Sequence, residues 1–378
     1  MLRKRFENKK ETKITYKHMK TYKHLYEKFI SKENIRLCIN KAAKGKRKSK
    51  EVQKVLSNVD YYITYIQNHI IDIVSTKHTP VEIYDGIQRK KRTIVVPTYF
   101  ECIVHHMLVQ VLMPLFSTGM YEHSYGSVPN KGTIKGMKTV KRWIADDYYS
   151  TQFCLQCDIR KYFQSIPHSI LKRKFIKRVK DRKILNILFI IIDSIDEGIA
   201  LGFYIFQWIA NWYLEDFDHY IKEVLKAKYY IRNMDDIVIF ASSKKELHEI
   251  RKYIQIYLQN VLQLQLKNTY AVFKIQSNKH HRTLDFLGFK FYRNRTILRK
   301  TILRKMRRKA LKIFKKNNAS IYDSRQMLSY LSYIKYCDIY NYYTKWIKGI
   351  IDFRTLRHKM SKYDKERNEQ YDRLCICG

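Results

Sequence analysis

Three aspartates in this sequence stand where a carboxylate is costly unless something binds it. Asp158 ends a run of alternating apolar residues, and Asp235 and Asp236 lie in a short turn between two strongly apolar segments. Neighbouring carboxylates repel each other, and burial beside apolar strands adds a desolvation cost. A divalent cation removes both costs. A lone Asp-Asp pair is more often a solvated hairpin tip, but the apolar flanks and the matching strand favour a metal site.

Phosphoryl transfer is the chemistry that such a cluster serves. Two ions about 3.5–4 Å apart activate the attacking oxygen and hold the leaving phosphate. Carboxylate oxygens suit Mg²⁺, so we predict Asp158, Asp235 and Asp236 as catalytic residues and as ligands of two Mg²⁺ ions, which Mn²⁺ can replace in vitro. Cys154 and Cys157 have a zinc-like spacing, but strand alternation puts their sulfurs on opposite faces.

The segments around the aspartates predict a mixed fold of strands and helices. Alternation over 153–159 predicts a strand whose Asp158 points away from its apolar face. Residues 228–240 predict a hairpin with the Asp-Asp pair in its turn. Apolar spacing predicts helices at 52–75, around 103–112, and at 169–192, 203–225, 244–262 and 305–365, β structure at 81–97 and 270–292, and a loop at 117–136.

The net charge of the chain indicates a polyanionic partner. The 378 residues contain 75 Lys and Arg against 34 Asp and Glu, a formal net charge of +41, which repels itself in a compact state. Nucleic acid fits better than a membrane, since the longest near-continuous apolar run, 184–192, is about half a membrane span. No apolar stretch follows the first charges, so we expect no signal peptide. Seven scattered cysteines favour a reducing compartment, and we expect a cytoplasmic protein.

Four motifs resemble those of reverse transcriptases and follow one another in that family's order. They are the first catalytic strand and turn at 157–168, the helix-entry motif at 198–211, the catalytic hairpin at 230–240 and the primer-grip strand at 284–289. The resemblance covers roughly residues 84–292, with a vaguer match beyond. It implies an α+β right-hand polymerase with fingers, a palm of antiparallel sheet and helices, and a helical thumb. Such an enzyme makes cDNA from an RNA template, a DNA primer and dNTPs.

The order of the motifs also implies domain boundaries. A basic helical N-terminal region is expected at 1–75, fingers at 76–150, a palm with the catalytic aspartates at 151–292, and a helical basic thumb with a C-terminal tail at 293–378. The segment 293–309 holds nine Lys and Arg, and a helix there would follow the phosphates of a primer–template duplex, unless it is a generic solvated face. The candidate duplex-binding residues are Arg299, Lys300, Arg304, Lys305, Arg307 and Arg308.

Further roles are implied by position within the family's motifs. Phe163, five residues after Asp158, matches the steric gate that excludes a ribose 2′-OH. Lys267 lies where polymerases place a cation near the leaving pyrophosphate, although a solvated lysine is the alternative. Arg92 and Lys131 match stretches of the fingers that grip the triphosphate, where Arg offers a planar fork and Lys a point charge.

One motif is most like that of the reverse transcriptases of diversity-generating retroelements. Leu201 precedes Gly202 where most reverse transcriptases have Gln, and Gln207 follows the aromatic-rich stretch, although Phe206 replaces a Ser of that type. This implies a prokaryotic or phage-encoded enzyme that copies a template repeat RNA with errors at adenines and works with a basic accessory protein. Leu201 and Gln207 are thus candidate nucleotide-binding residues. An apolar Leu201 cannot hydrogen-bond the incoming nucleotide and would then contribute to the errors. The alternative is that Leu201 is only a packing substitution.

Two other functions remain open. An anti-phage defence reverse transcriptase would catalyse the same reaction but would synthesise DNA on its own RNA or without a template. A non-catalytic RNA-binding protein on a polymerase scaffold is favoured only by Asn233, which stands where the family has an aromatic or small residue. Val128 also replaces an Arg of the fingers motif. The three aspartates and Phe163 speak against the scaffold alternative.

Overall fold

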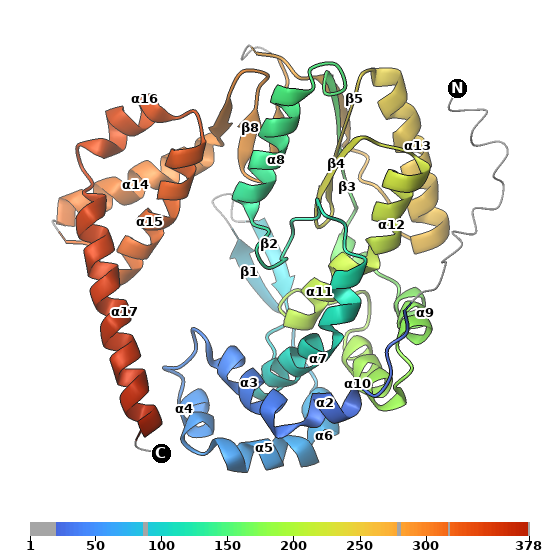
Figure 1. Cartoon of the computed structure of the whole chain (residues 1–378), viewed down its shortest axis with the longest axis vertical. Coiled ribbons are helices and arrows are strands. Elements are labelled where there is room, and N and C mark those ends of the chain that lie inside the picture. The colour runs from blue at the N-terminus through green and yellow to red at the C-terminus, as the bar shows by residue number, and fades with distance from the viewer. Residues whose placement is uncertain (1–19, 86–89, 278–280, 317, 377–378) are drawn as a thin grey trace. The chain divides into compact units, whose positions relative to one another are not determined.

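The computed structural model describes residues 20–85, 90–277, 281–316 and 318–376. They form two compact units, whose helices and strands are labelled in Figure 1. Unit 1 contains the described residues of 1–83, 91–120 and 163–213, and unit 2 contains those of 84–90, 121–162 and 214–378. Each unit is therefore built from segments that are distant in the sequence.

Unit 1 is built around one long apolar helix, α7 (Tyr99–Thr118). It begins at a capping box, in which the Thr98 hydroxyl accepts from the Glu101 N–H and the Glu101 carboxylate accepts from the Thr98 N–H. Helices α2 (Tyr26–Ile30), α3 (Lys32–Ala43), α6 (Ile70–Val74) and α11 (Tyr204–Tyr213) pack against α7. By length and composition α7 could cross a membrane, yet most of it is buried inside the protein. The apolar side chains of α7 are therefore explained by its place in the core of unit 1.

The predicted helix at 52–75 is divided into three. It forms α4 (Lys50–Ser57), α5 (Val59–Asn68) and α6. The break occurs because the Asn58 side chain accepts from the N–H of Tyr61 and so starts a new helix.

The predicted helix at 169–192 is divided as well. It forms α9 (His168–Arg178) and α10 (Arg182–Asp193), because one carboxylate oxygen of Asp181 accepts from two N–H groups at the start of α10. The other oxygen accepts from two N–H groups at the start of α2, at 2.9 and 2.8 Å. A single side chain therefore caps two helices.

The β structure predicted at 81–97 is a two-stranded hairpin. Its strands are β1 (Val81–Asp85) and β2 (Lys90–Ile94). The turn expected at Asp85-Gly86 falls largely at 86–89, outside the described residues.

Unit 2 contains a four-stranded antiparallel sheet in the order β4-β5-β3-β6. Its strands are β3 (Phe153–Asp158), β4 (Tyr229–Asn233), β5 (Asp236–Ala241) and β6 (Ala271–Lys274). The register of β3 with β5 runs from Phe153 opposite Ala241 to Asp158 opposite Asp236. Successive side chains of a strand point to opposite faces of the sheet. The register therefore decides which side chains of neighbouring strands lie side by side on one face.

Both faces of this sheet are covered, which corrects one expectation about β3. Helix α13 (Lys244–Leu262) packs against β3, β5 and β6, while an apolar cluster that includes α8 (Thr133–Asp146) covers the other face (Figure 1). Alternation places Cys154 with Asp158 on an outward face, but Cys154 is fully buried in this cluster. The face becomes less buried only at Gln156 and Asp158.

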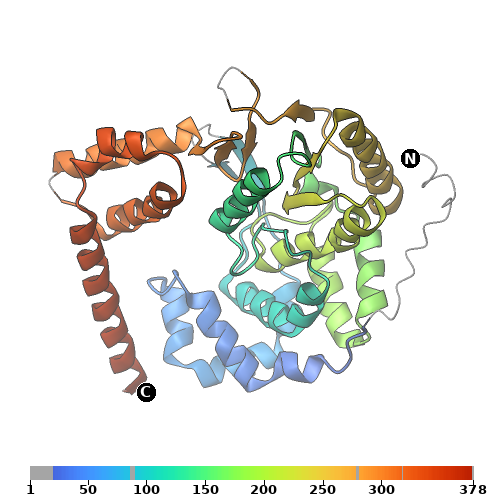
Figure 2. The same ribbon diagram turned by 45° about the horizontal axis from the view of Figure 1, so that its top comes forward.

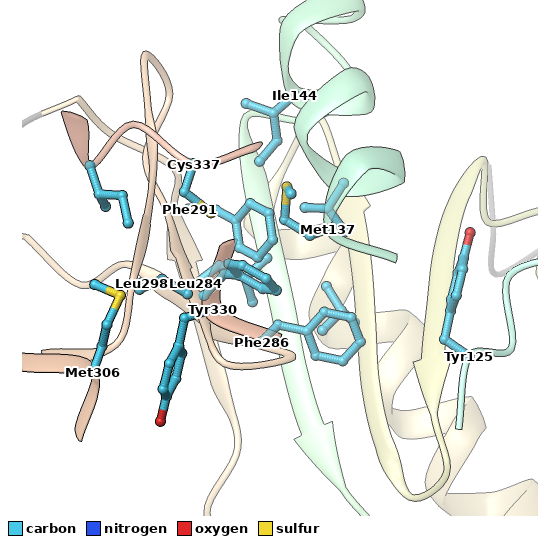
Figure 3. Close-up of a cluster of buried hydrophobic side chains, with 14 of the residues drawn as sticks. Tyr125, Met137, Ile144, Leu284, Phe286, Phe291, Leu298, Met306, Tyr330 and Cys337 are labelled. Atoms are coloured by element: carbon cyan, nitrogen blue, oxygen red, sulfur yellow. The ribbon is translucent and has the colours of Figure 1, made fainter. Parts of the chain in front are cut away.

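The cluster continues into the C-terminal part of unit 2 (Figure 3). Strands β7 (Leu284–Phe286), β8 (Phe289–Phe291) and β9 (Thr296–Leu298) form a second antiparallel sheet. Phe291 of this sheet, Met137 of α8 and Met306 of the next helix are buried in the same cluster. The small sheet therefore shares a core with both α8 and the C-terminal helices.

Helices make up the rest of unit 2. They are α12 (Glu215–His219), a π-helical turn at Tyr220–Val224, α14 (Lys300–Lys316), α15 (Ile321–Tyr336), α16 (Tyr340–Tyr343), a second π-helical turn at Thr344–Lys348, and α17 (Phe353–Ile376). Figure 2 shows α15 beside α14 and α17. The bounds of α13 agree with the prediction, whereas the loop predicted at 117–136 is shorter because α8 begins at Thr133.

A buried histidine on α7 makes the stability of unit 1 depend on pH. Burial, followed by the charges of His106 and His78, lowers the pKa of His105 from 6.5 to about 3. Below pH 6.5 the unfolded chain takes up a proton that the folded chain does not, so acid favours unfolding. Between about pH 7.5 and 5, wild type should lose about 2 kcal/mol more unfolding free energy than His105→Phe.

Urea denaturation at both pH values measures this difference. The exposed His248 gives the control, since His248→Phe should keep the pH dependence of the wild type. The same pH dependence in wild type and in His105→Phe would contradict the expectation.

Candidate active site

The register of the sheet brings the three aspartates together at one end of it. Asp158 is the last residue of β3 and lies opposite Asp236, the first residue of β5. Asp235 comes directly before β5, and its carbonyl accepts from the N–H of Ile159 at 3.2 Å. Antiparallel pairing therefore brings Asp158 next to the adjacent pair Asp235 and Asp236, which is distant from it in the sequence.

A tight turn of the hairpin presents Asp235. Asn233 pairs with Asp236 across the hairpin, so Met234 and Asp235 form its two-residue loop. Met234 has a φ of +55°, in the left-handed region that side chains rarely adopt. Such a conformation costs free energy and persists only where its surroundings hold it.

Burial and mutual repulsion disfavour the charged forms of these aspartates. Burial raises the pKa of Asp235, and the charge of Asp158 raises it further. Burial, followed by the charge of Asp158, raises the pKa of Asp236 to about 7, although a hydrogen bond from Gln156 acts against this. A cation close to the cluster would therefore favour the charged forms of Asp235 and Asp236.

Lys267 provides one such cation. Its Nζ lies 2.6 Å from Oδ2 of Asp158, and its N–H donates to the Asp158 carbonyl at 2.8 Å. An antiparallel bridge between Ile159 and Leu266 brings the two segments together. The structure thus places this lysine against the aspartate cluster itself.

The donor atoms at this edge suit a divalent cation. Oδ1 of Asp158 is buried and has no hydrogen-bond partner among the described residues. The available ligands are carboxylate oxygens, which Mg²⁺ prefers. Across the described residues, no three His, Cys, Asp or Glu side chains already converge into a metal site. The residues fit a divalent cation by their chemistry, and Lys267 occupies only Oδ2 of Asp158.

Close backbone contacts in unit 1 fix two of the predicted nucleotide-binding residues. The Ile199 N–H donates to the Phe163 carbonyl at 2.8 Å, and the Val95 N–H donates to the Leu201 carbonyl at 2.8 Å. Gly202 has a φ of +118°, and a Cβ there would lie 1.9 Å from the Val95 carbonyl oxygen. Only glycine fits, so the backbone that carries the half-buried Leu201 is held closely.

The remaining predicted nucleotide-binding residues are divided between the units. Gln207, half-buried on α11, and Arg92, exposed on β2, belong to unit 1. Phe163 and Leu201 belong to the same unit. Lys131 belongs to unit 2, together with Lys267 and the aspartates. Their roles toward a nucleotide stay predictions.

Lys131 has a local structural role. Its Nζ donates to the carbonyls of Tyr121 and Glu122 at 3.1 and 2.7 Å. Burial, followed by the charge of Lys135, lowers the pKa of Lys131. The ammonium closes the loop before α8 by binding these two carbonyls.

The six predicted duplex-binding cations fall into two groups. Those that are exposed on α14 are Lys300, Arg304, Lys305 and Arg308. Arg299 instead forms an ion pair with Asp285, and the guanidinium of Arg307 lies 3.4 Å from the centroid of the Trp346 ring. The first group is exposed and its role toward a duplex stays a prediction, whereas the second group makes contacts within unit 2.

Sequence patterns do not single out Gln156, Arg232 and Asp218, which bind one of the aspartates or hold the hairpin that carries them. The Gln156 amide donates to the Asp285 carbonyl at 2.9 Å and hydrogen-bonds Asp236. Arg232 is fully buried and paired with Asp218. A usable signal exists for Arg232, because a charge in an apolar strand needs a buried partner.

Fold and site together define a class of protein. The antiparallel sheet of unit 2 carries aspartates at the end of its central strand and in the adjoining hairpin, and a small sheet and a helical region follow it. This is the arrangement of a right-hand polymerase, and the α+β fold expected from the sequence is confirmed.

The family is shown by comparison with known families. The family described as "Reverse transcriptase (RNA-dependent DNA polymerase)" matches residues 75–291, more than half of the chain. The protein therefore belongs to the reverse transcriptase family.

More distant similarities cover parts of other proteins. Protein YkfC of Escherichia coli (strain K12) is 24% identical over 145 residues, which are 35% of this chain and 38% of that protein. The solved structures of apo telomerase from Candida tropicalis are similar at 12% identity. The form truncated from its C-terminal domain has a TM-score of 0.44, with 58% of this chain and 54% of that chain covered. The second apo telomerase structure has a TM-score of 0.41, with 57% and 47% covered. This chain thus spans well under two thirds of each of these proteins.

The raised pKa of Asp236 predicts that its carboxylate destabilises the protein without a metal. The folded chain binds more protons than the unfolded chain, so stability falls as pH rises through about 7. In EDTA at about pH 8, Asp236→Asn should therefore raise the free energy of unfolding by about 1–2 kcal/mol, and at about pH 5 it should have much less effect.

Chemical denaturation at both pH values tests this sign. Asp147→Asn is the matched control, because its ion pair with Lys228 lowers the pKa of Asp147 and the substitution should destabilise. An Asp236→Asn variant that is less stable than wild type at the higher pH would refute the expectation.

Proposed function

We propose that the chain is an RNA-directed DNA polymerase that makes cDNA with two divalent metal ions. Asp158, Asp235 and Asp236 would hold the ions, most suitably Mg²⁺. The observation that carries this proposal is the meeting of Asp158, Asp235 and Asp236 at one edge of the sheet, where burial and the charge of Asp158 raise the pKa values of Asp235 and Asp236, in a chain of the reverse transcriptase family. RNA template, DNA primer and dNTPs are the proposed partners.

The residues of the chain have separate parts in the proposed reaction. Bound ions would activate the attacking 3′-hydroxyl and neutralise charge at the leaving phosphate. Lys267, once released from Asp158, would stand ready to neutralise or protonate the leaving pyrophosphate. Phe163 would exclude a ribose 2′-OH, while Arg92 and Lys131 would hold the triphosphate.

We further propose the function of a diversity-generating retroelement enzyme. Leu201 and Gln207 support this type, and the Leu201 side chain has no group that can hydrogen-bond the incoming nucleotide. The template would then be a repeat RNA copied with errors at adenines, and a basic protein would assist. The domain boundaries at 75, 150 and 292 and a place in a prokaryotic cytoplasm belong to the same proposal.

Primer extension tests the polymerase proposal. Wild-type protein should extend a DNA primer on an RNA template with dNTPs and Mg²⁺, and Asp235→Ala should lower the rate about 1,000-fold or more. Glu249→Ala, which changes a carboxylate on α13, should extend as wild type does. No extension by wild type, with or without a basic partner protein, would favour the RNA-binding scaffold instead.

Sequencing of the products tests the role of Leu201. Wild type should misincorporate mainly opposite template adenines, and Leu201→Gln should reduce these errors about 10-fold by restoring a hydrogen-bonding side chain. Leu185→Gln changes another half-buried leucine of unit 1 and should leave the error spectrum unchanged. Extension without an adenine bias would move the assignment to a defence reverse transcriptase.

A further inference from the structure

We propose that the buried pair of Arg232 and Asp218 is a positioning device, which sets the place of Asp235 through the carbonyl oxygen of Met234. This inference rests on the proposed role of Asp235 as a metal ligand. Arg232 lies on β4, three residues before Asp235, and Asp218 lies on α12.

The guanidinium of Arg232 connects two parts of unit 2. Its Nε and Nη2 donate to Oδ1 and Oδ2 of Asp218 at 2.8 and 2.6 Å, which is a bidentate pair. Its Nη1 donates to the Met234 carbonyl at 2.9 Å. Because the guanidinium is planar and rigid, fixing two of its nitrogens on Asp218 also fixes the direction of the third.

The Asp218 end of the device is itself held. Arg232 and Asp218 have 0% and 1% of their side chains exposed, so water does not compete for their bonds. The Tyr230 hydroxyl donates to Oδ1 of Asp218 at 2.5 Å. Tyr121 stacks on the Tyr230 ring at 5.1 Å and donates to the Tyr230 carbonyl at 2.8 Å. The anchor is therefore a packed network and not an isolated ion pair.

The backbone of the hairpin is restrained from its other edge. The Arg232 N–H donates to the His123 carbonyl at 3.0 Å, and the Tyr125 N–H donates to the Arg232 carbonyl at 2.9 Å. Gly126 follows, and a Cβ there would lie 2.7 Å from the backbone nitrogen of Met234. The segment 123–126 thus runs against the turn with no room between them.

These restraints act on the residue whose backbone is least favourable. Met234 is in the left-handed region, so the turn would relax unless its carbonyl were held. The Met234 carbonyl and the Asp235 N–H belong to one planar peptide group. A change in the direction of that carbonyl therefore turns the start of Asp235 and moves its carboxylate relative to Asp158.

Stability alone does not explain a buried ion pair at this place. Apolar residues of similar volume often replace such pairs without loss, since desolvation offsets much of the attraction. What an apolar pair cannot supply is the third hydrogen bond, which reaches the turn. The geometry therefore points to positioning as the role of Arg232.

Arg232→Lys tests the proposal because it keeps the charge and removes the fork. An ammonium can bind Asp218 or approach the Met234 carbonyl but cannot fix the direction of both bonds. Single-nucleotide incorporation should slow about 100-fold, as expected for a misplaced catalytic group, while the Kd for primer–template stays within about twofold. The Mg²⁺ concentration for half-maximal rate should rise.

Hydrogen exchange provides a readout that needs no activity. Peptides that cover 229–241 should exchange faster in Arg232→Lys than in wild type, while peptides from α14 and α15 should not change. Asp147→Asn is the matched control, because Asp147 binds Lys228 and Tyr229 at the far end of the same hairpin. It should leave the incorporation rate unchanged, and any faster exchange that follows from its lower stability should not be greater at the turn than in the rest of unit 2.

Gly126→Ala provides a second route if Arg232→Lys does not fold. Its methyl group presses on Met234, which supplies the three nearest atoms, and it should also slow incorporation and speed exchange at the turn. Wild-type incorporation by Arg232→Lys, or exchange that rises throughout unit 2, would overturn the proposal. So would a folded Gly126→Ala with normal exchange and rate. If wild type itself does not polymerise, the proposed function fails, while the exchange comparison still decides whether the pair sets the turn.

Discussion

Repulsion among Asp158, Asp235 and Asp236 is the physical constraint to which the surrounding structure responds. The register of β3 with β5 places the carboxylates together, and burial between two covered faces of the sheet makes their charges more costly. A fold that served stability alone would not keep such a group. The hard cation proposed above would offset this cost, because the available donors are carboxylate oxygens.

Two basic residues near this cluster do different work. Lys267 compensates charge, because its Nζ contacts Asp158 directly. Arg232 binds Asp218 and the Met234 carbonyl and so acts on the backbone that carries Asp235. A flexible lysine can be displaced when a metal enters, whereas a buried guanidinium with three fixed bonds stays in place. The division follows from the chemistry of the two side chains.

The sequence predicts those parts of the site that local patterns determine. Alternation gives β3 and the hairpin, and the apolar spacing gives the bounds of α13. Prediction from the sequence fails where a contact between distant segments decides where a helix ends or which side chain is buried. Asp181 divides a predicted helix because it caps α2 as well as α10, and Cys154 is buried because the second small sheet and α8 cover its face. The Arg232–Asp218 pair is of the same kind, since neither strand pattern nor helix pattern specifies which charges will meet.

The basic residues of the chain have different roles in the structure, which composition alone does not distinguish. With 75 cations and 34 acidic residues, many cations cannot have a carboxylate partner. Several bind main-chain carbonyls instead. Lys131, Lys174 and Lys222 each donate to two main-chain carbonyl oxygens. Four of these six hydrogen bonds are partly buried, so each of the three ammonium groups serves the fold first. Contact with a nucleic acid is therefore better argued from the exposed cations of one helix face, as on α14, than from the density of Lys and Arg along the sequence.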